Sequence, residues 1–178
     1  MKTQIKLICR VLFSVALLAC AVIPISSPAA GLSNYFNNKV LDYVYRGQTF
    51  TAPTVACVAL TTSTPTAAST GATISEASYT GYARGQLNPS ASNWSGTGGE
   101  TSGASTGTTG TVKNNVAITI GSAPSSGPTT VTSFAILDSC TVGAGNVLAF
   151  AALTANKTIN SGDSAPVFAI NALTVHLQ

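Results

Sequence analysis

Short apolar runs separated by segments rich in Gly, Ser, Asn and Asp recur along the last third of the chain. They lie within residues 131–136, 147–153 and 167–177, and β-branched and aromatic side chains are frequent in them. Runs of this length, bounded by turn residues, predict strands rather than helices. The glycines of residues 142–146 predict a hairpin connection, and residues 160–163 predict a second turn.

The last of these runs alternates regularly. Leu173, Val175 and Leu177 are separated by small or polar residues, which predicts a half-buried antiparallel strand with one apolar face. Earlier segments extend the β pattern. They are strands at 54–61, 79–87 and 112–120, a turn at 123–128, and a long exposed loop or ragged hairpin at 88–110 around Trp94.

About seven short strands with Gly- and Pro-rich turns between them predict an all-β fold. The expected architecture is an antiparallel, jelly-roll-like β-sandwich over residues 48–178. The side chains expected in its core are Val58, Leu60, Ile118, Phe134, Phe150, Phe168, Leu173 and Val175.

One amphipathic helix is predicted before the sandwich, at residues 33–46. Ser33 or Asn34 can cap it, Leu32 precedes the cap, and Gly47 ends it. Its apolar stripe consists of Tyr35, Phe36, Val40, Leu41 and Val44. We expect this helix to pack on the sheet with Val40, Leu41 and Val44 facing inward.

The charged fraction of the chain is low and changes the expected surface. Charged residues make up 7% of the chain, against roughly 25% in an average globular protein. Three of the eight basic residues are Lys2, Lys6 and Arg10, so five basic and five acidic residues remain after residue 30. A neutral surface rich in hydroxyl groups does not suit nucleic acid, which binds basic stripes.

Residues 1–30 have the pattern of a targeting segment, and residues 31–178 are expected to form a single domain. Three positive charges precede an apolar run at 11–25, and small residues follow. Three interpretations are open: a cleaved secretory signal, a lipoprotein signal with its cysteine at Cys20, and a retained membrane anchor. The leader therefore predicts export, and any membrane contact would be made only through residues 1–30.

Candidate chemistry is scarce. His176 is the only histidine and lies on the polar side of the last predicted strand, which does not favour a catalytic role. The five carboxylates after residue 30 are scattered and form no metal-ligand pattern. No glycine-rich segment follows a strand and opens a helix. The sequence therefore predicts no catalytic residue, no metal and no cofactor.

Cys57 and Cys140 are the two cysteines after residue 30. Cys57 is expected near the middle of a strand, and Cys140 is expected at one end of the sandwich, beside polar residues. A disulfide requires Cα atoms within roughly 7 Å of each other. We therefore expect no bond, with Cys57 buried and Cys140 exposed.

Three blocks of sequence resemble a known family. They are GLSNYFNNKVLDYVYRGQTFTAPTVACVALTTSTPT at residues 31–66, GYARGQL at 81–87, and TTVTSFAILDS with GNVLAFAALTANKTINSGDSAPVFAINALTVHL in the last third. In this order they resemble small phage structural proteins, which include tail-fibre proteins and jelly-roll proteins that decorate capsids. The resemblance implies a non-enzymatic virion subunit and no catalytic residue.

Two kinds of function follow from this reading. A charge-poor surface lowers the desolvation cost of an interface, which favours self-association or packing on a virion shell or tail protein. The leader leaves open an exported cell-surface or filament subunit built on the same type of domain. The rival function is a receptor- or carbohydrate-binding module for a host-surface glycan. The residues proposed for interaction are Tyr35, Phe36, Tyr79, Tyr82 and Trp94.

Overall fold

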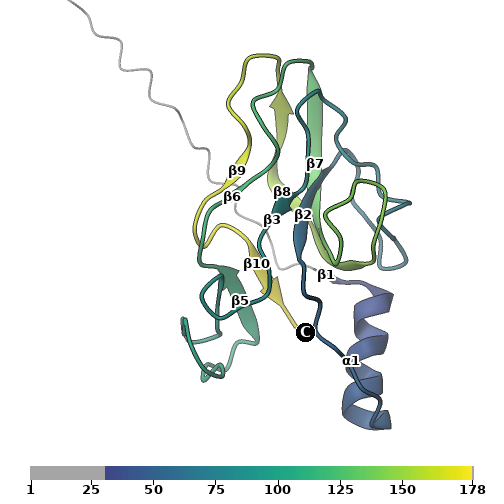
Figure 1. Ribbon diagram of the computed structural model, residues 1–178, viewed down its shortest axis with the longest axis vertical. Helices are drawn as coiled ribbons and strands as arrows, with labels where there is room; N and C mark the ends of the chain where they lie inside the picture. Colours follow the sequence, from purple (N-terminus) through teal and green to yellow (C-terminus); the bar gives the residue numbers. More distant parts are fainter. Residues whose placement is uncertain (1–30, 178) are drawn as a thin grey trace, which may run out of the picture.

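The computed structural model describes residues 31–177, and the interpretations of residues 1–30 lie outside this range. The described chain is an antiparallel β structure with one helix, as predicted (Figure 1). Its elements are β1 (Gly31–Leu32), α1 (Asn34–Arg46), β2 (Cys57–Thr61), β3 (Gly85–Gln86), β4 (Trp94–Ser95), β5 (Thr111–Asn114), β6 (Ile118–Thr119), β7 (Thr129–Leu137), β8 (Val147–Ile159), β9 (Val167–Phe168) and β10 (Thr174–His176).

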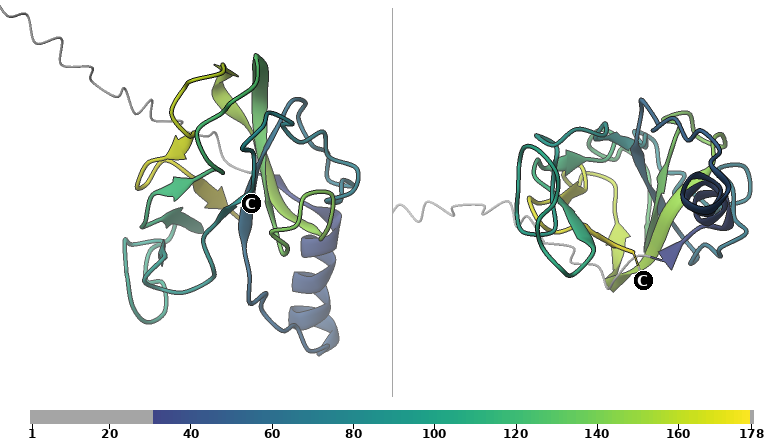
Figure 2. Two further views of the ribbon diagram at one scale, coloured as in Figure 1. Left: turned by 45° about the horizontal axis from the view of Figure 1, so that its top comes forward. Right: turned by 90° about the horizontal axis from the view of Figure 1, so that it is seen from below.

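The strands form two layers. The main sheet has the order β1-β8-β7-β2-β3, and the second layer is made of the sheet β10-β5-β4 and the pair β6-β9. Viewed from below in Figure 2, the second layer faces one side of the main sheet and α1 lies beyond its other side. Phe134 of β7 and Phe168 of β9 join the layers with an edge-to-face contact, their ring centroids 5.7 Å apart.

Six of the eight predicted core residues are fully buried. They are Val58, Leu60, Ile118, Phe134, Phe168 and Leu173. Val175 is half-buried against the same cluster. Phe150 was assigned to the wrong face: it lies opposite Gly31 of β1 and packs with Ala59, Ala135, Leu137 and Val147 on the other side of the main sheet. A register shift between Ile136 and Leu137 brings Val147 to that face as well.

Several predicted strands are shorter than expected. The segments 79–87, 112–120 and 167–177 contain strand pairing only at β3, at β5 and β6, and at β9 and β10. Asn114 explains two of the interruptions. Its buried side chain donates to the carbonyls of Val116 (2.9 Å) and Ala169 (2.7 Å) and accepts from the N–H of Leu173 (2.8 Å). These bonds turn the chain after β5 and before β10, so neither segment continues as one extended strand. Leu177, which was predicted to face inward, is exposed.

The helix has the predicted ends. The Ser33 hydroxyl accepts a hydrogen bond from the Phe36 N–H at 3.1 Å, and Gly47 closes the helix with φ 65°. Its predicted orientation is wrong, because Leu41 and Val44 are exposed and Val40 is only half-buried. The cause lies at the first turn, where the N–H of Ser33 donates to Leu148 and the N–H of Asn34 donates to Ala67. These bonds direct the helix away from the main sheet (Figure 1).

Candidate assembly surface

Helix α1 presents the largest group of exposed apolar side chains among the described residues. Leu41 is 51% exposed, Tyr43 60%, Val44 59% and Tyr45 81%. Of the eight large apolar side chains that are exposed in the described range, these four lie within five consecutive positions. Val40 and Val44 are four residues apart and therefore share one face of the helix. We call this set, Val40, Leu41, Tyr43, Val44 and Tyr45, the α1 apolar surface.

The charges of α1 are engaged within the helix itself. Arg46 forms an ion pair with Asp42 at 2.7 Å, and the Lys39 ammonium lies over the Tyr35 ring, 5.7 Å from its centroid. A pair with i,i+4 spacing supports a helix modestly and leaves its other faces uncharged. The α1 apolar surface contains no charged side chain, and the charges beside it are engaged within the helix.

The base of the helix is fixed to the body. Phe36 makes an edge-to-face contact with Phe50, which lies in the segment returning to β2, with ring centroids 6.0 Å apart. Tyr35 and Phe36 are both half-buried. These two predicted interaction residues thus lie at the attached end of α1, while Tyr43 and Tyr45, which the sequence interpretation did not select, are the exposed aromatic residues. The sequence feature that could have identified Tyr43 and Tyr45 is their position near the end of a capped helix.

The other three predicted interaction residues belong to the sandwich. Tyr79 is buried and packs edge-to-face on Tyr82, with centroids 5.5 Å apart. Burial raises the pKa of the Tyr79 hydroxyl. Trp94 is half-buried and donates from Nε1 to the carbonyl of Leu87 at 3.2 Å. None of the three presents a freely exposed ring for stacking.

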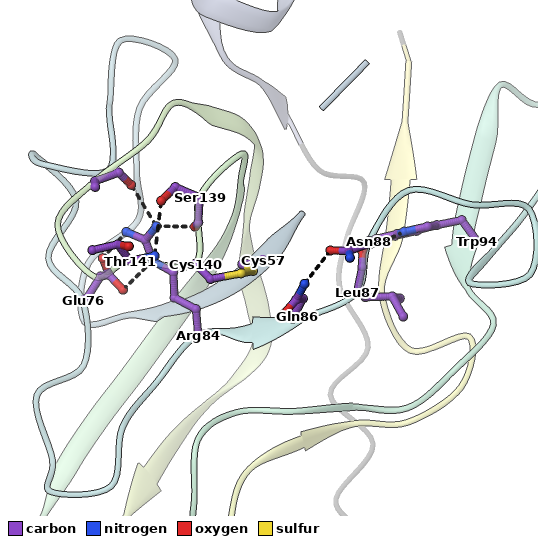
Figure 3. The surroundings of a disulfide bond; sticks show 11 residues. Cys57, Glu76, Arg84, Gln86, Leu87, Asn88, Trp94, Ser139, Cys140 and Thr141 are labelled. Atoms are coloured by element: carbon purple, nitrogen blue, oxygen red, sulfur yellow. Dashed lines mark hydrogen bonds and ion pairs between the residues drawn. A yellow bond between two sulfur atoms is a disulfide. The ribbon is translucent and has the colours of Figure 1, made fainter. Parts of the chain in front are cut away.

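A buried ion pair occupies the end of the sandwich where β7 turns into β8 (Figure 3). Arg84 Nη2 lies 2.5 Å from Glu76 Oε1, and the two side chains are 0% and 6% exposed. Arg84 also donates to the carbonyls of Ser139 (2.6 Å) and Ala144 (2.8 Å). The guanidinium donates hydrogen bonds to all of these acceptors, and in this way it holds residues 139–144 against the sandwich.

Glu76 accepts hydrogen bonds from three sides. Besides Arg84, the Tyr82 hydroxyl donates to Oε2 at 2.8 Å and the Gly143 N–H donates to Oε1 at 3.1 Å. Burial alone would raise the pKa of Glu76, but the bonds from Arg84, Gly143 and Tyr82 outweigh it and lower this pKa below its ordinary value. Burial, together with the Glu76 charge, raises the pKa of Tyr82. Glu76 is therefore a carboxylate, and Tyr82 donates to it as a neutral phenol.

The segment GYARGQL is explained by this arrangement. Tyr82 and Arg84 both bind Glu76, and Gly85 lets β3 approach β6 closely. A Cβ at position 85 would lie 2.7 Å from Ile118 Cγ2 and from Ile120 Cδ1. The role of this segment is thus structural. The sequence analysis singled out Tyr82 but not Glu76, the partner that Tyr82 shares with Arg84.

The prediction for the cysteines is wrong: Cys57 and Cys140 form a disulfide, with Cα atoms 5.2 Å apart (Figure 3). Cys57 is the first residue of β2, not its middle, and pairs with Leu137, the last residue of β7. Cys140 follows Leu137 by three residues, so it lies beside the start of β2. Cys57 is buried as predicted, but Cys140 is half-buried instead of exposed.

The described residues hold no group of three or more His, Cys, Asp or Glu side chains placed to bind a metal ion. His176, in β10, is half-buried and pairs in register with Thr111 of β5. Among the helices of residues 31–177, none is long and apolar enough to cross a membrane.

A family model described as Podophage GP4 fiber I protein gp80 matches residues 31–176. The chain belongs to this fibre family. The match confirms the resemblance to phage structural proteins and identifies the chain as one of them. Membership in the fibre family supports a structural protein of a phage virion. No curated protein matches the chain.

Proposed function

We propose that the chain is a virion fibre subunit that assembles with further copies of itself through the α1 apolar surface. The observation that carries the proposal is a 13-residue helix attached to the sandwich by its first turn, with four large apolar side chains at least half exposed. Helices of this kind gain most of their stability by burying their apolar face. A contiguous exposed apolar patch on a soluble protein commonly marks an interaction site.

A second copy is the partner that the charges favour. The described residues contain five basic and five acidic side chains, so copies carry no net charge that would keep them apart. A heterologous partner would be expected to complement a charged rim, and the charges of α1 are instead paired within the helix. Membership in a fibre family supports an assembly built from repeated subunits.

Decoration of a capsid and binding of a host glycan remain the other candidate roles. Glycan binding is usually supported by aromatic rings exposed for stacking. Tyr79 is buried and Tyr82 and Trp94 are half-buried, so these residues favour the assembly proposal over the glycan proposal.

Val44→Lys tests the proposal. Lysine has a higher helix propensity than valine, and a cation near the end of a helix is favourable, so α1 should remain folded. A charge buried without a partner costs several kcal/mol, so we expect association to weaken by about two orders of magnitude. Sedimentation velocity over a range of concentrations measures this change.

Val116→Lys is the matched control, because it makes the same substitution at an exposed valine outside α1. This variant should sediment like the parent chain. The proposal fails if the parent is a monomer at high concentration and physiological salt, or if Val44→Lys and Val116→Lys sediment alike.

A further inference from the structure

Two different kinds of contact hold residues 138–146, the loop between β7 and β8, to the sandwich. One is the disulfide from Cys140 to Cys57. The other is the pair of hydrogen bonds from Arg84 to the carbonyls of Ser139 and Ala144, together with the bond from Gly143 N–H to Glu76. The second set consists of hydrogen bonds made by the two members of the Arg84–Glu76 ion pair, and it does not involve sulfur.

The loop also has its own internal and neighbouring contacts. Asp138 accepts from the N–H of Asn146 at 2.6 Å and from its Nδ2 at 2.8 Å. The N–H of Gly71 donates to the carbonyl of Gly145 at 2.8 Å. The pairing of Cys57 with Leu137 then fixes the distance from β2 to the first part of the loop. Each contact that brings Cys140 to Cys57 can therefore form while both residues are thiols.

We infer that the chain reaches this fold with Cys57 and Cys140 reduced, and that oxidation then locks the loop in place. This would make the disulfide a redox-sensitive lock added to a complete fold, not a condition for folding. The ion pair between Arg84 and Glu76 positions the thiols, and the covalent bond follows.

The exposure of the two cysteines sets the order of the chemistry. Cys57 is fully buried in the folded chain and Cys140 is half-buried. With oxidised glutathione as the oxidant, the Cys140 thiolate attacks one sulfur, forms a mixed disulfide and releases one glutathione thiolate. The Cys57 thiol loses its proton, its sulfur attacks the Cys140 sulfur, and the second glutathione leaves as a thiolate. Two electrons pass from the cysteines to glutathione.

Such a lock suits a protein that folds and works in different redox environments, and this reading rests on the proposed function as a virion subunit. The cytosol keeps thiols reduced, whereas disulfides persist outside the cell. A virion protein assembled in the cytoplasm would fold by its hydrogen bonds and gain the covalent bond after release.

The test uses the full chain with Cys9→Ser and Cys20→Ser, so that Cys57 and Cys140 are the only thiols. The reduced chain should give the near-ultraviolet circular dichroism of the oxidised chain and a lower Tm. Oxidised glutathione is then added to two further variants in the same background. Cys57→Ala should take up one glutathione at Cys140, whereas Cys140→Ser should react at Cys57 about a hundredfold more slowly than in denaturant.

Arg84→Met with Glu76→Gln provides the second arm, because it removes the ion pair without leaving a buried charge. In the reduced form of this variant, Cys57 should lose most of its protection from reaction with oxidised glutathione. The oxidised form of the variant should keep the near-ultraviolet signal. The inference is overturned if the reduced parent lacks that signal, if Cys57 reacts as fast as in denaturant, or if the double variant protects Cys57 as well as the parent. Each readout is made at low concentration on single chains, so failure here is distinct from failure of Val44→Lys to change association.

Discussion

Phe168→Ala is expected to lower the free energy of unfolding by about 3–5 kcal/mol. Phe168 is fully buried in β9 and packs edge-to-face on Phe134 of β7, so its ring joins the two layers of the sandwich. Removing the ring deletes its burial and leaves a cavity between strands that belong to different sheets. Chemical denaturation followed by circular dichroism measures the change.

Ile170→Ala is the control for this experiment. Ile170 lies two residues further along the chain and is 56% exposed, so its replacement should change stability by about 0.5 kcal/mol or less. A change below about 1 kcal/mol at Phe168, or equal changes at both positions, would show that the second layer does not pack on the main sheet as described.

Arg84→Met is expected to cost a similar amount, about 3–5 kcal/mol at pH 7. The Arg84 side chain is fully buried, and its loss leaves the Glu76 carboxylate enclosed with only Tyr82 and Gly143 as donors. Two carbonyls of the β7–β8 loop also lose their donor. Adding Glu76→Gln removes the buried charge and should recover part of the loss, which a double-mutant cycle measures.

The pH dependence of this variant has a definite sign. In the parent chain the pKa of Glu76 is lowered from 4.5, so its ionised form contributes stability above that value and loses it only as pH falls through the lower folded pKa. Without Arg84, burial raises the pKa of Glu76, and protonation relieves the penalty. The difference in stability between parent and Arg84→Met should therefore shrink as the pH falls from the raised pKa of Glu76 in the variant, above 4.5, to its lowered pKa in the parent. A difference that stays constant from pH 7 to pH 3 would mean that Glu76 is not the group left unpaired.

The sequence was informative where local rules determine the structure. The cap at Ser33 and the stop at Gly47 defined α1, and the apolar run at residues 54–61 placed β2 within three residues of its start. Both signals depend on neighbours in the chain, which a pattern of apolar and polar residues records directly.

Contacts between distant segments were not predictable in the same way. The direction of α1 depends on bonds from Ser33 to Leu148 and from Asn34 to Ala67, and an amphipathic pattern does not show which partner covers the apolar face. The disulfide was missed because its geometry depends on β2 beginning at Cys57, a boundary that patterns place only within a few residues.

Site-specific photo-crosslinking from α1 tests the central proposal most directly. A photoreactive phenylalanine analogue placed at Val44 reports which molecule covers the α1 apolar surface, and the same analogue at Val116 serves as the control at an exposed position outside α1. The account predicts that position 44 crosslinks to a second copy of this chain in purified virions, while position 116 gives little product. Efficient crosslinking from position 44 to a different virion protein, or no crosslink from position 44 in assembled particles, would contradict it.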